Sequence, residues 1–130
     1  MERILGPVAP YLYALMRVGV GLLFACHGAQ KLFGLLGGPQ LPLMSRFGIA
    51  GVVEFFGGLM VALGFLTGTA AFIASGEMAA AYFIAHFPQG PIPLLNKGEL
   101  AVVYCFLWLF VAAHGAGIWS VDNAMARGRR

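Results

Sequence analysis

Long runs of apolar residues, separated by short segments rich in glycine and proline, dominate this chain. Each run is close to the roughly 20 residues that an α-helix needs to cross the hydrocarbon core of a bilayer. The glycines and prolines between the runs favour turns and end helices. The pattern therefore predicts four membrane-spanning helices, over residues of about 10–33, 47–66, 69–87 and 97–119.

The composition supports the same class of protein. Of the 130 residues, 60% are hydrophobic and only 10% are charged, whereas an average soluble domain has roughly 25% charged residues. We therefore expect an all-α integral membrane four-helix bundle, with residues 1–130 forming a single domain. A net charge of only +3 without a basic, aromatic-rich face predicts no nucleic-acid partner. Cys26 and Cys105 lie in different apolar runs, which predicts neither a disulfide nor a thiol redox motif.

The distribution of basic residues suggests an orientation in the membrane. An even number of spans places both termini on one side, where the nearby basic residues are Arg3, Arg127, Arg129 and Arg130. The loops on the other side contain Lys31, Arg46 and Lys97. Because loops rich in lysine and arginine stay in the cytoplasm, we expect a multi-pass protein of a prokaryotic inner membrane, surrounded by lipid, with both termini in the cytoplasm.

Several ionisable residues fall inside the predicted spans. An unpaired charge at the centre of a membrane helix costs about 2.5–3.5 kcal/mol, so these groups should face inward and pair. Arg17 and Glu77 are both near the middle of their spans, and we predict that they form a structural ion pair. Lys31 lies about 21 Å further along the first helix than Arg17, so it belongs to a second layer.

That second layer is the predicted ligand site, towards the end of the bundle away from the termini. Its members are His27, Lys31, Glu54 and Glu99, with His86 and Asn96 close by. Glu54 lies roughly 10 Å inside its helix and needs a partner, for which His27 is at a comparable depth. Structural interpretations stay open: Arg17 and Glu77 would then fix helix register, Glu99 would cap its helix, and Lys31 would extend to the membrane surface.

The spacing of these residues separates three kinds of chemistry. Haem ligation needs two histidines at one depth, but His27 and His86 differ by roughly 7 Å. No metal-binding motif is present, and no covalently bound cofactor is expected. A polar pocket near the bilayer edge suits the head group of a quinone or another amphipathic molecule. The apolar loop 34–46 is hypothesised to cover this pocket.

Several short motifs occur in order along the chain. The first span contains Arg17 and then the run from His27 to Gly34, and the second contains the run from Glu54 to Gly58. Glu77 lies in the third span, and the runs Asn96–Glu99 and Gly115–Asp122 open and close the fourth. With these motifs, which extend over nearly the whole chain, the protein resembles the DoxX family of small four-helix membrane proteins.

This resemblance implies a function linked to redox chemistry. Relatives are associated with quinone-linked thiosulfate oxidation and with membrane complexes that respond to thiol or oxidative stress. We therefore expect a redox-linked accessory membrane subunit that binds a quinone-like molecule, with a protein partner or a homo-oligomer supplying the rest of a quinone-linked oxidoreductase. The alternatives are a non-catalytic assembly subunit of a larger complex and a transporter of small molecules or lipids.

Overall fold

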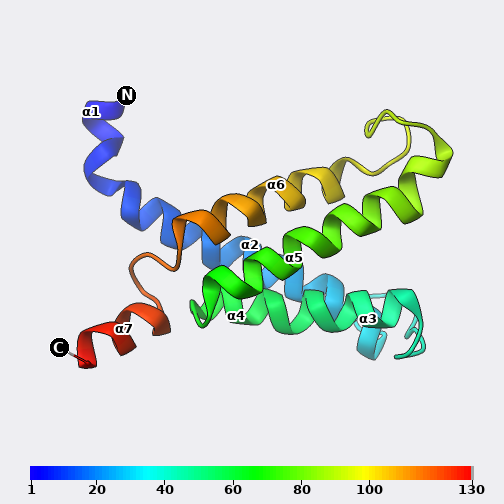
Figure 1. The fold of residues 1–130 in the computed structure, drawn as a ribbon, viewed down its shortest axis with the longest axis horizontal. Coiled ribbons are helices and arrows are strands. Elements are labelled where there is room, and N and C mark those ends of the chain that lie inside the picture. The colour runs from blue at the N-terminus through cyan, green and yellow to red at the C-terminus, as the bar shows by residue number, and fades with distance from the viewer. Residues whose placement is uncertain (130) are drawn as a thin grey trace.

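The protein is a bundle of helices that run side by side along one axis, as a computed structural model describes it for residues 1–129 (Figure 1). Arg130, one of the arginines used to predict orientation, lies outside the described residues. The element order is α1 (Glu2–Leu5), η1 (Gly6–Val8), α2 (Ala9–Phe33), α3 (Arg46–Val52), η2 (Val53–Gly57), α4 (Gly58–Leu63), α5 (Thr67–Ala81), η3 (Tyr82–His86), η4 (Phe87–Gln89), α6 (Glu99–His114) and α7 (Val121–Gly128).

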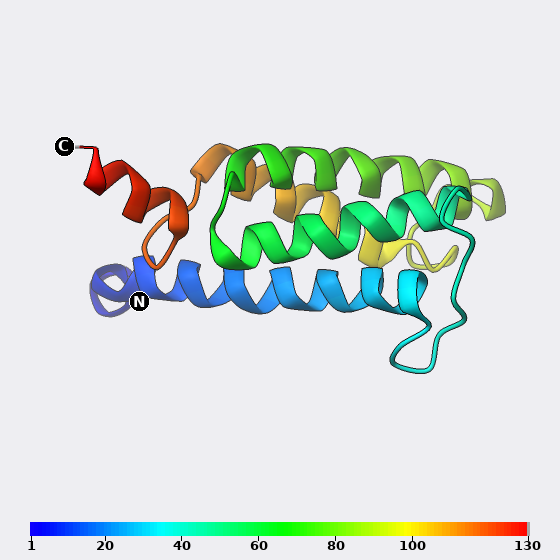
Figure 2. The same cartoon turned by 90° about the horizontal axis from the view of Figure 1, so that it is seen from below.

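The prediction of an all-α membrane bundle is confirmed. Within residues 1–129, three continuous helical segments are long and apolar enough to cross a membrane: Glu2–Phe33, Arg46–Leu63 and Thr67–Gln89. The first and last described residues lie at the same end of the bundle (Figure 2), as an even number of crossings requires.

The fourth predicted span is shorter than expected. Helix α6 has 16 residues and ends at His114, whereas the sequence predicted a helix to residue 119. Gly115 has a φ of 85° and Gly117 a φ of 67°, values that favour glycine and are incompatible with a continuing α-helix. The chain then runs without helical structure to Ser120, whose side chain accepts a hydrogen bond from the Asn123 amide and caps α7.

Glycines allow α2 and the second span to pack with their backbones in contact. A Cβ atom on Gly21 would lie 2.8 Å from the Ala62 nitrogen, and one on Gly58 would lie 2.5 Å from the Ala25 nitrogen. No real Cβ atom tolerates such distances, so both positions require glycine for this packing. Close approach through small residues is a common way for helices to associate in lipid.

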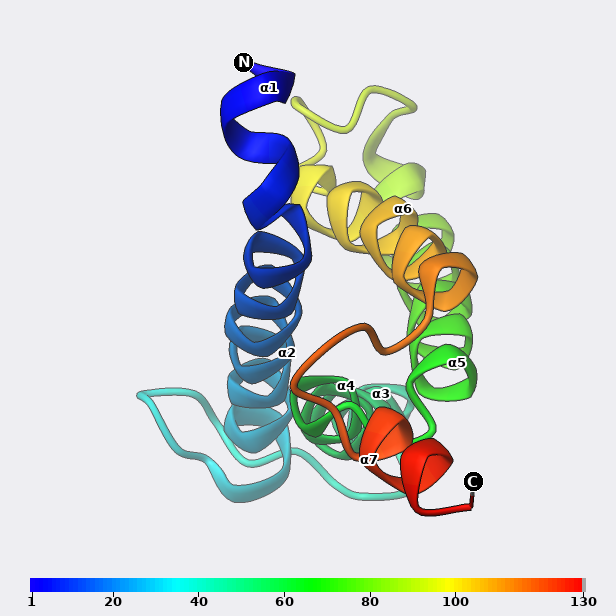
Figure 3. The same cartoon turned by 90° about the vertical axis from the view of Figure 1, so that its left-hand side faces the viewer.

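Aromatic side chains bridge α2 and α6 instead. The ring of Phe24 lies 5.1 Å from that of Tyr104 and 5.2 Å from that of Trp108, measured between ring centroids. Viewed along the bundle, α4 lies between α2 and α5, and α6 lies beside α5 (Figure 3). Phe24 and Trp108 are both fully buried, and Phe24 lines the cavity described next.

Candidate functional site

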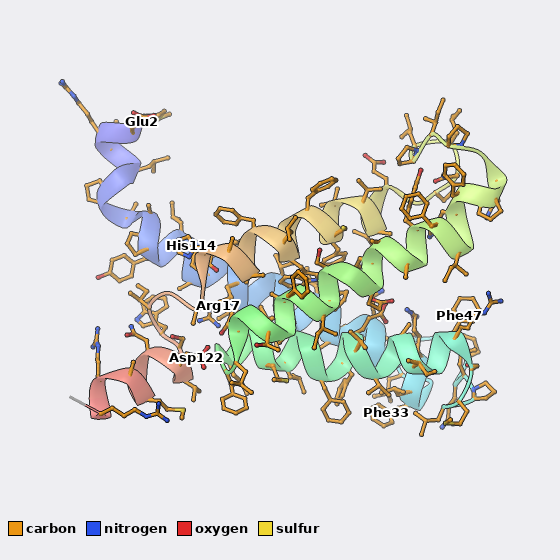
Figure 4. The ribbon with its side chains drawn as sticks, in the orientation of Figure 1. Glu2, Arg17, Phe33, Phe47, His114 and Asp122 are labelled. Atoms are coloured by element: carbon orange, nitrogen blue, oxygen red, sulfur yellow. The ribbon has the colours of Figure 1, made fainter. Side chains whose placement is uncertain are left out.

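A cavity of about 540 Å³ lies among the four spans. It begins at Phe24 and Tyr104 and extends towards Phe47, which Figure 4 shows at the end of the bundle away from the chain termini. Most of its walls are apolar, and its polar lining residues are His27, Lys31, Arg46, Glu54, Glu77, His86, Lys97 and Tyr104. The volume falls within the range of about 300–1,000 Å³ that is typical of small-molecule sites.

An ion pair between Lys31 and Glu54 forms the polar floor of this cavity. The Lys31 Nζ atom lies 2.5 Å from Glu54 Oε1. The Glu54 side chain is 4% exposed and the Lys31 side chain 26%, so the carboxylate is the more deeply buried partner. The predicted partner of Glu54 was His27, one helical turn before Lys31. Helical side chains lean towards the N-terminus, so the long lysine stem brings its ammonium group back to the depth of His27.

Two π-helical segments flank the cavity. Glu54 lies in η2, and η3 ends at His86, which lines the opposite wall. A π-helical turn contains one more residue than an α-helical turn, and such turns occur frequently at functional sites. Here they lie in the two helices that contribute Glu54 and His86.

Glu77 also lines this cavity and does not pair with Arg17. Within residues 1–129, Lys31–Glu54 is the single salt bridge, so the predicted Arg17–Glu77 ion pair is wrong. The prediction assumed that residues at the middle of a span lie at the middle of the bundle. Helix α2 has 25 residues and is about 37 Å long, and it extends past α4, α5 and α6 at the end that contains the termini (Figure 2). Arg17 therefore lies near that end.

Arg17 binds backbone carbonyls at the end of the bundle that contains the termini. Its side chain is fully buried, and Nη1 donates to the Val61 and Ala62 carbonyls at 2.5 and 2.7 Å. These carbonyls belong to the last turn of α4, where a cation is favoured by the helix dipole. The Nη2 atom donates to the Trp119 carbonyl at 2.7 Å. This bond ties the non-helical segment after α6, which begins at Gly115, to α2.

Asp122 completes this junction, close to Arg17 and His114 in Figure 4. Its carboxylate accepts hydrogen bonds from the Leu66 and Thr67 amides at 2.8 and 2.9 Å and from the Thr67 hydroxyl at 2.9 Å. Partial burial raises the pKa of Asp122, but these hydrogen bonds and the Arg17 charge outweigh it and hold the pKa below its ordinary value. The junction thus fixes the C-terminal segment against α5.

Glu99 lies outside the cavity, contrary to its predicted place in the ligand site. It is exposed in the first turn of α6, and it is absent from the residues that line the cavity. Asn96 is buried in the preceding turn, where its Oδ1 atom accepts from the Gly98 amide at 2.8 Å. Glu99 is the first residue of α6 and is exposed, so it does not share the site of His27, Lys31 and Glu54.

Sequence reasoning missed Tyr104 and the role of two basic residues at the rim. Tyr104 is largely buried, and its ring lies 6.3 Å from that of His27. Arg46 and Lys97 had been assigned only to the loops, yet both line the cavity. Lys97 has a φ of 60°, an uncommon conformation for a residue other than glycine. The sequence feature that could have identified Tyr104 as a site residue is its position within an apolar span, because a buried tyrosine hydroxyl needs a polar partner.

Of the loop 34–46, only Arg46 lines the cavity, so the hypothesis that this loop covers the cavity is wrong for residues 34–45. Its residues from Gln40 to Leu43 pack beside Leu32 and Phe56 on another surface of the bundle. The Leu41 amide donates to the Lys31 carbonyl at 2.8 Å, which holds the loop near the end of α2. In the part of the chain that the structure describes, no three His, Cys, Asp or Glu side chains gather as metal ligands would.

Comparison with known proteins places this arrangement in a family. The model of the DoxX family matches residues 12–87. The chain belongs to the DoxX family. A relative in Haemophilus influenzae, described as an uncharacterized protein, is 38% identical over 127 residues, and the match spans 88% of this chain and 90% of the relative. The inner membrane protein YqjF of Escherichia coli is 30% identical over 118 residues, spanning 84% and 88% of the two chains. No solved structure matches the chain significantly.

The DoxX match includes the charged floor of the cavity. Lys31, Glu54 and Glu77 all fall within residues 12–87, whereas Lys97 and Tyr104 lie beyond the match. The matched part of this DoxX protein therefore contributes the three charged groups, and α6 completes the wall beside them.

Proposed function

We propose that this DoxX protein is a redox-linked accessory membrane subunit that binds a quinone-like molecule in the cavity among its four spans. The observation that carries the proposal is the Lys31–Glu54 ion pair at the floor of a cavity with mostly apolar walls. Charged groups inside membrane helices are costly and commonly mark substrate or proton pathways. A quinone-like molecule combines a flat, lipid-soluble ring, which suits the apolar walls, with polar oxygens, which suit the charged floor.

Each polar group has a role in this proposal. The Lys31 ammonium group lies where it stabilises negative charge that develops on a ligand oxygen. Glu54 and His27 exchange protons with the ligand, as carboxylates and imidazoles do in general acid–base catalysis. Both residues line the cavity. The quinone-like ligand itself would accept and release electrons, and the electron source would bind on a partner protein.

The proposed location is a prokaryotic inner membrane with both termini in the cytoplasm. The relative in Escherichia coli is named an inner membrane protein. Arg3 and Arg127 lie at the end of the bundle that contains both termini, and excess basic residues favour the cytoplasmic side. In this orientation the cavity rim, with Arg46 and Lys97, faces the outer side of the membrane.

A cavity-filling substitution tests the proposal without changing any charge. Ala81 lines the cavity, whereas Ala79 lies on the same helix but outside the lining. The protein and the Ala81→Leu and Ala79→Leu variants are purified from membranes, extracted with organic solvent and analysed by mass spectrometry for bound quinone. We expect quinone with the natural protein and with Ala79→Leu, and much less with Ala81→Leu.

The other outcomes decide between the proposed function and its alternatives. Absence of quinone from all three preparations, together with a firmly attached second protein, supports a non-catalytic assembly subunit. Equal quinone content in Ala81→Leu and Ala79→Leu shows that quinone adheres elsewhere, for example to the lipid-facing surface, and refutes the cavity as its site.

A further inference from the structure

Two buried carboxylate oxygens at the cavity have no hydrogen-bond partner. They are Glu54 Oε2 and Glu77 Oε2, and within residues 1–129 no donor reaches either atom. Glu54 is 3% exposed, so bulk water does not readily supply the missing hydrogen bond. An ionised carboxylate only accepts hydrogen bonds, and a buried acceptor without a donor is unfavourable. These two oxygens at the cavity therefore lack hydrogen-bond donors from the described residues.

The ionisable groups around these two oxygens do not supply the missing hydrogen bonds. The Lys31 ammonium group is directed to Oε1 of Glu54, the other oxygen of the same carboxylate. Among the described residues no ion pair involves Glu77. The remaining ionisable groups on the cavity wall are His27 from α2, Arg46 from α3, His86 from η3, and Lys97 and Tyr104 from the last span and the turn before it. The floor thus has one lysine for two carboxyl groups.

We propose that the site prefers the reduced, dihydroxy form of its ligand, the quinol, over the quinone. The inference rests on the function proposed above and adds the redox form of the ligand. A quinol has two O–H groups that donate to Glu54 Oε2 and Glu77 Oε2, whereas the carbonyl oxygens of a quinone are acceptors and face two further acceptors. A single hydrogen bond to a charged group favours the quinol by about tenfold or more in affinity.

The experiment compares the two redox forms of one probe. A decyl-tailed benzoquinone and the matching benzoquinol are titrated separately into the purified protein without oxygen, and binding is followed by calorimetry. For the natural protein we expect the quinol to bind at least about tenfold more tightly than the quinone.

Glutamine variants identify the oxygens responsible. Glu77→Gln removes no ion pair and introduces an amide that donates as well as accepts, so we expect the preference for the quinol to fall, with the remainder due to Glu54 Oε2. Glu99→Gln makes the same chemical change outside the cavity and should keep the full preference. If Glu77→Gln fails to fold, Glu54→Gln in a Lys31→Met background makes the equivalent change at the other oxygen.

The possible results separate this inference from the proposed function. Equal affinities, or tighter binding of the quinone, overturn the preference while a quinone-class ligand remains supported. Binding of neither probe refutes the proposed function and the inference together. A preference that is undiminished in the glutamine variants overturns the assignment to Glu54 Oε2 and Glu77 Oε2.

Discussion

Replacement of Lys31 by methionine tests whether the floor of the cavity depends on its ion pair. At the observed 2.5 Å between Lys31 Nζ and Glu54 Oε1, the Coulomb attraction is about 7 kcal/mol for an effective dielectric constant of about 20. Desolvation offsets much of this energy, and Glu54 bears most of that cost because its side chain is only 4% exposed. Methionine keeps a stem of similar length but leaves the buried carboxylate without its cation.

We expect Lys31→Met to lower the free energy of unfolding by about 3–5 kcal/mol, the usual cost of breaking one half of a buried ion pair. The Lys31→Met/Glu54→Gln double variant should recover most of this loss, because no uncompensated buried charge remains. The resulting interaction energy should be about 2–3 kcal/mol.

Unfolding is followed in mixed detergent micelles by the fluorescence of Trp108, which is fully buried in the folded bundle. Lys97→Met is the matched control, because Lys97 is exposed at the rim and makes no ion pair within residues 1–129. A loss below about 1 kcal/mol for Lys31→Met, similar to that of an exposed pair, would show that Glu54 is not held by Lys31. Additive losses in the double variant would lead to the same conclusion.

Two further predictions concern the junction at the opposite end. Arg17→Met removes the donors to the Val61, Ala62 and Trp119 carbonyls. We expect the free energy of unfolding to fall by about 3–5 kcal/mol, and proteolysis after His114 to become faster. Ligand binding should be unchanged in the folded protein. Faster proteolysis elsewhere would contradict this. The pKa of Asp122 is below its ordinary value of 3.8, so its contribution to stability is complete above that pH and is lost as the pH falls through the lowered value. Stability measured against pH should show this loss in the natural protein but not in Asp122→Asn.

The fold class was predictable because it follows from local composition. Apolar runs of about 20 residues must form helices in lipid, where the backbone has no water to bond to. The end of α2 at Phe33 was predictable from the glycines that begin with Gly34, which adopts a positive φ. The second span was predicted to end at about residue 66, but its helix ends at Leu63, before a glycine with a positive φ. The fourth span was predicted to continue past Gly115 and Gly117, and the hydrogen bond from Arg17 to the Trp119 carbonyl, 102 residues away in the chain, was not visible in the sequence.

The candidate site was predictable only in part, and the reason is geometric. That Lys31 and Glu54 share a polar layer follows from depth along two neighbouring helices, which the helical rise supplies. Which charges form pairs depends on how far each helix slides along its neighbours and how far each side chain reaches. These quantities placed Arg17 among carbonyls, Glu77 in the cavity and Glu99 outside it.

By itself, then, the sequence determined that the chain spans a membrane as helices and that its charges lie inside the bundle, because lipid imposes both conditions on every helix separately. The tertiary structure alone decided which charges meet, where the cavity opens and which carboxylate oxygens lack a donor. Those properties depend on the relative placement of helices, and that placement is set by glycine contacts and aromatic packing between segments far apart in the chain.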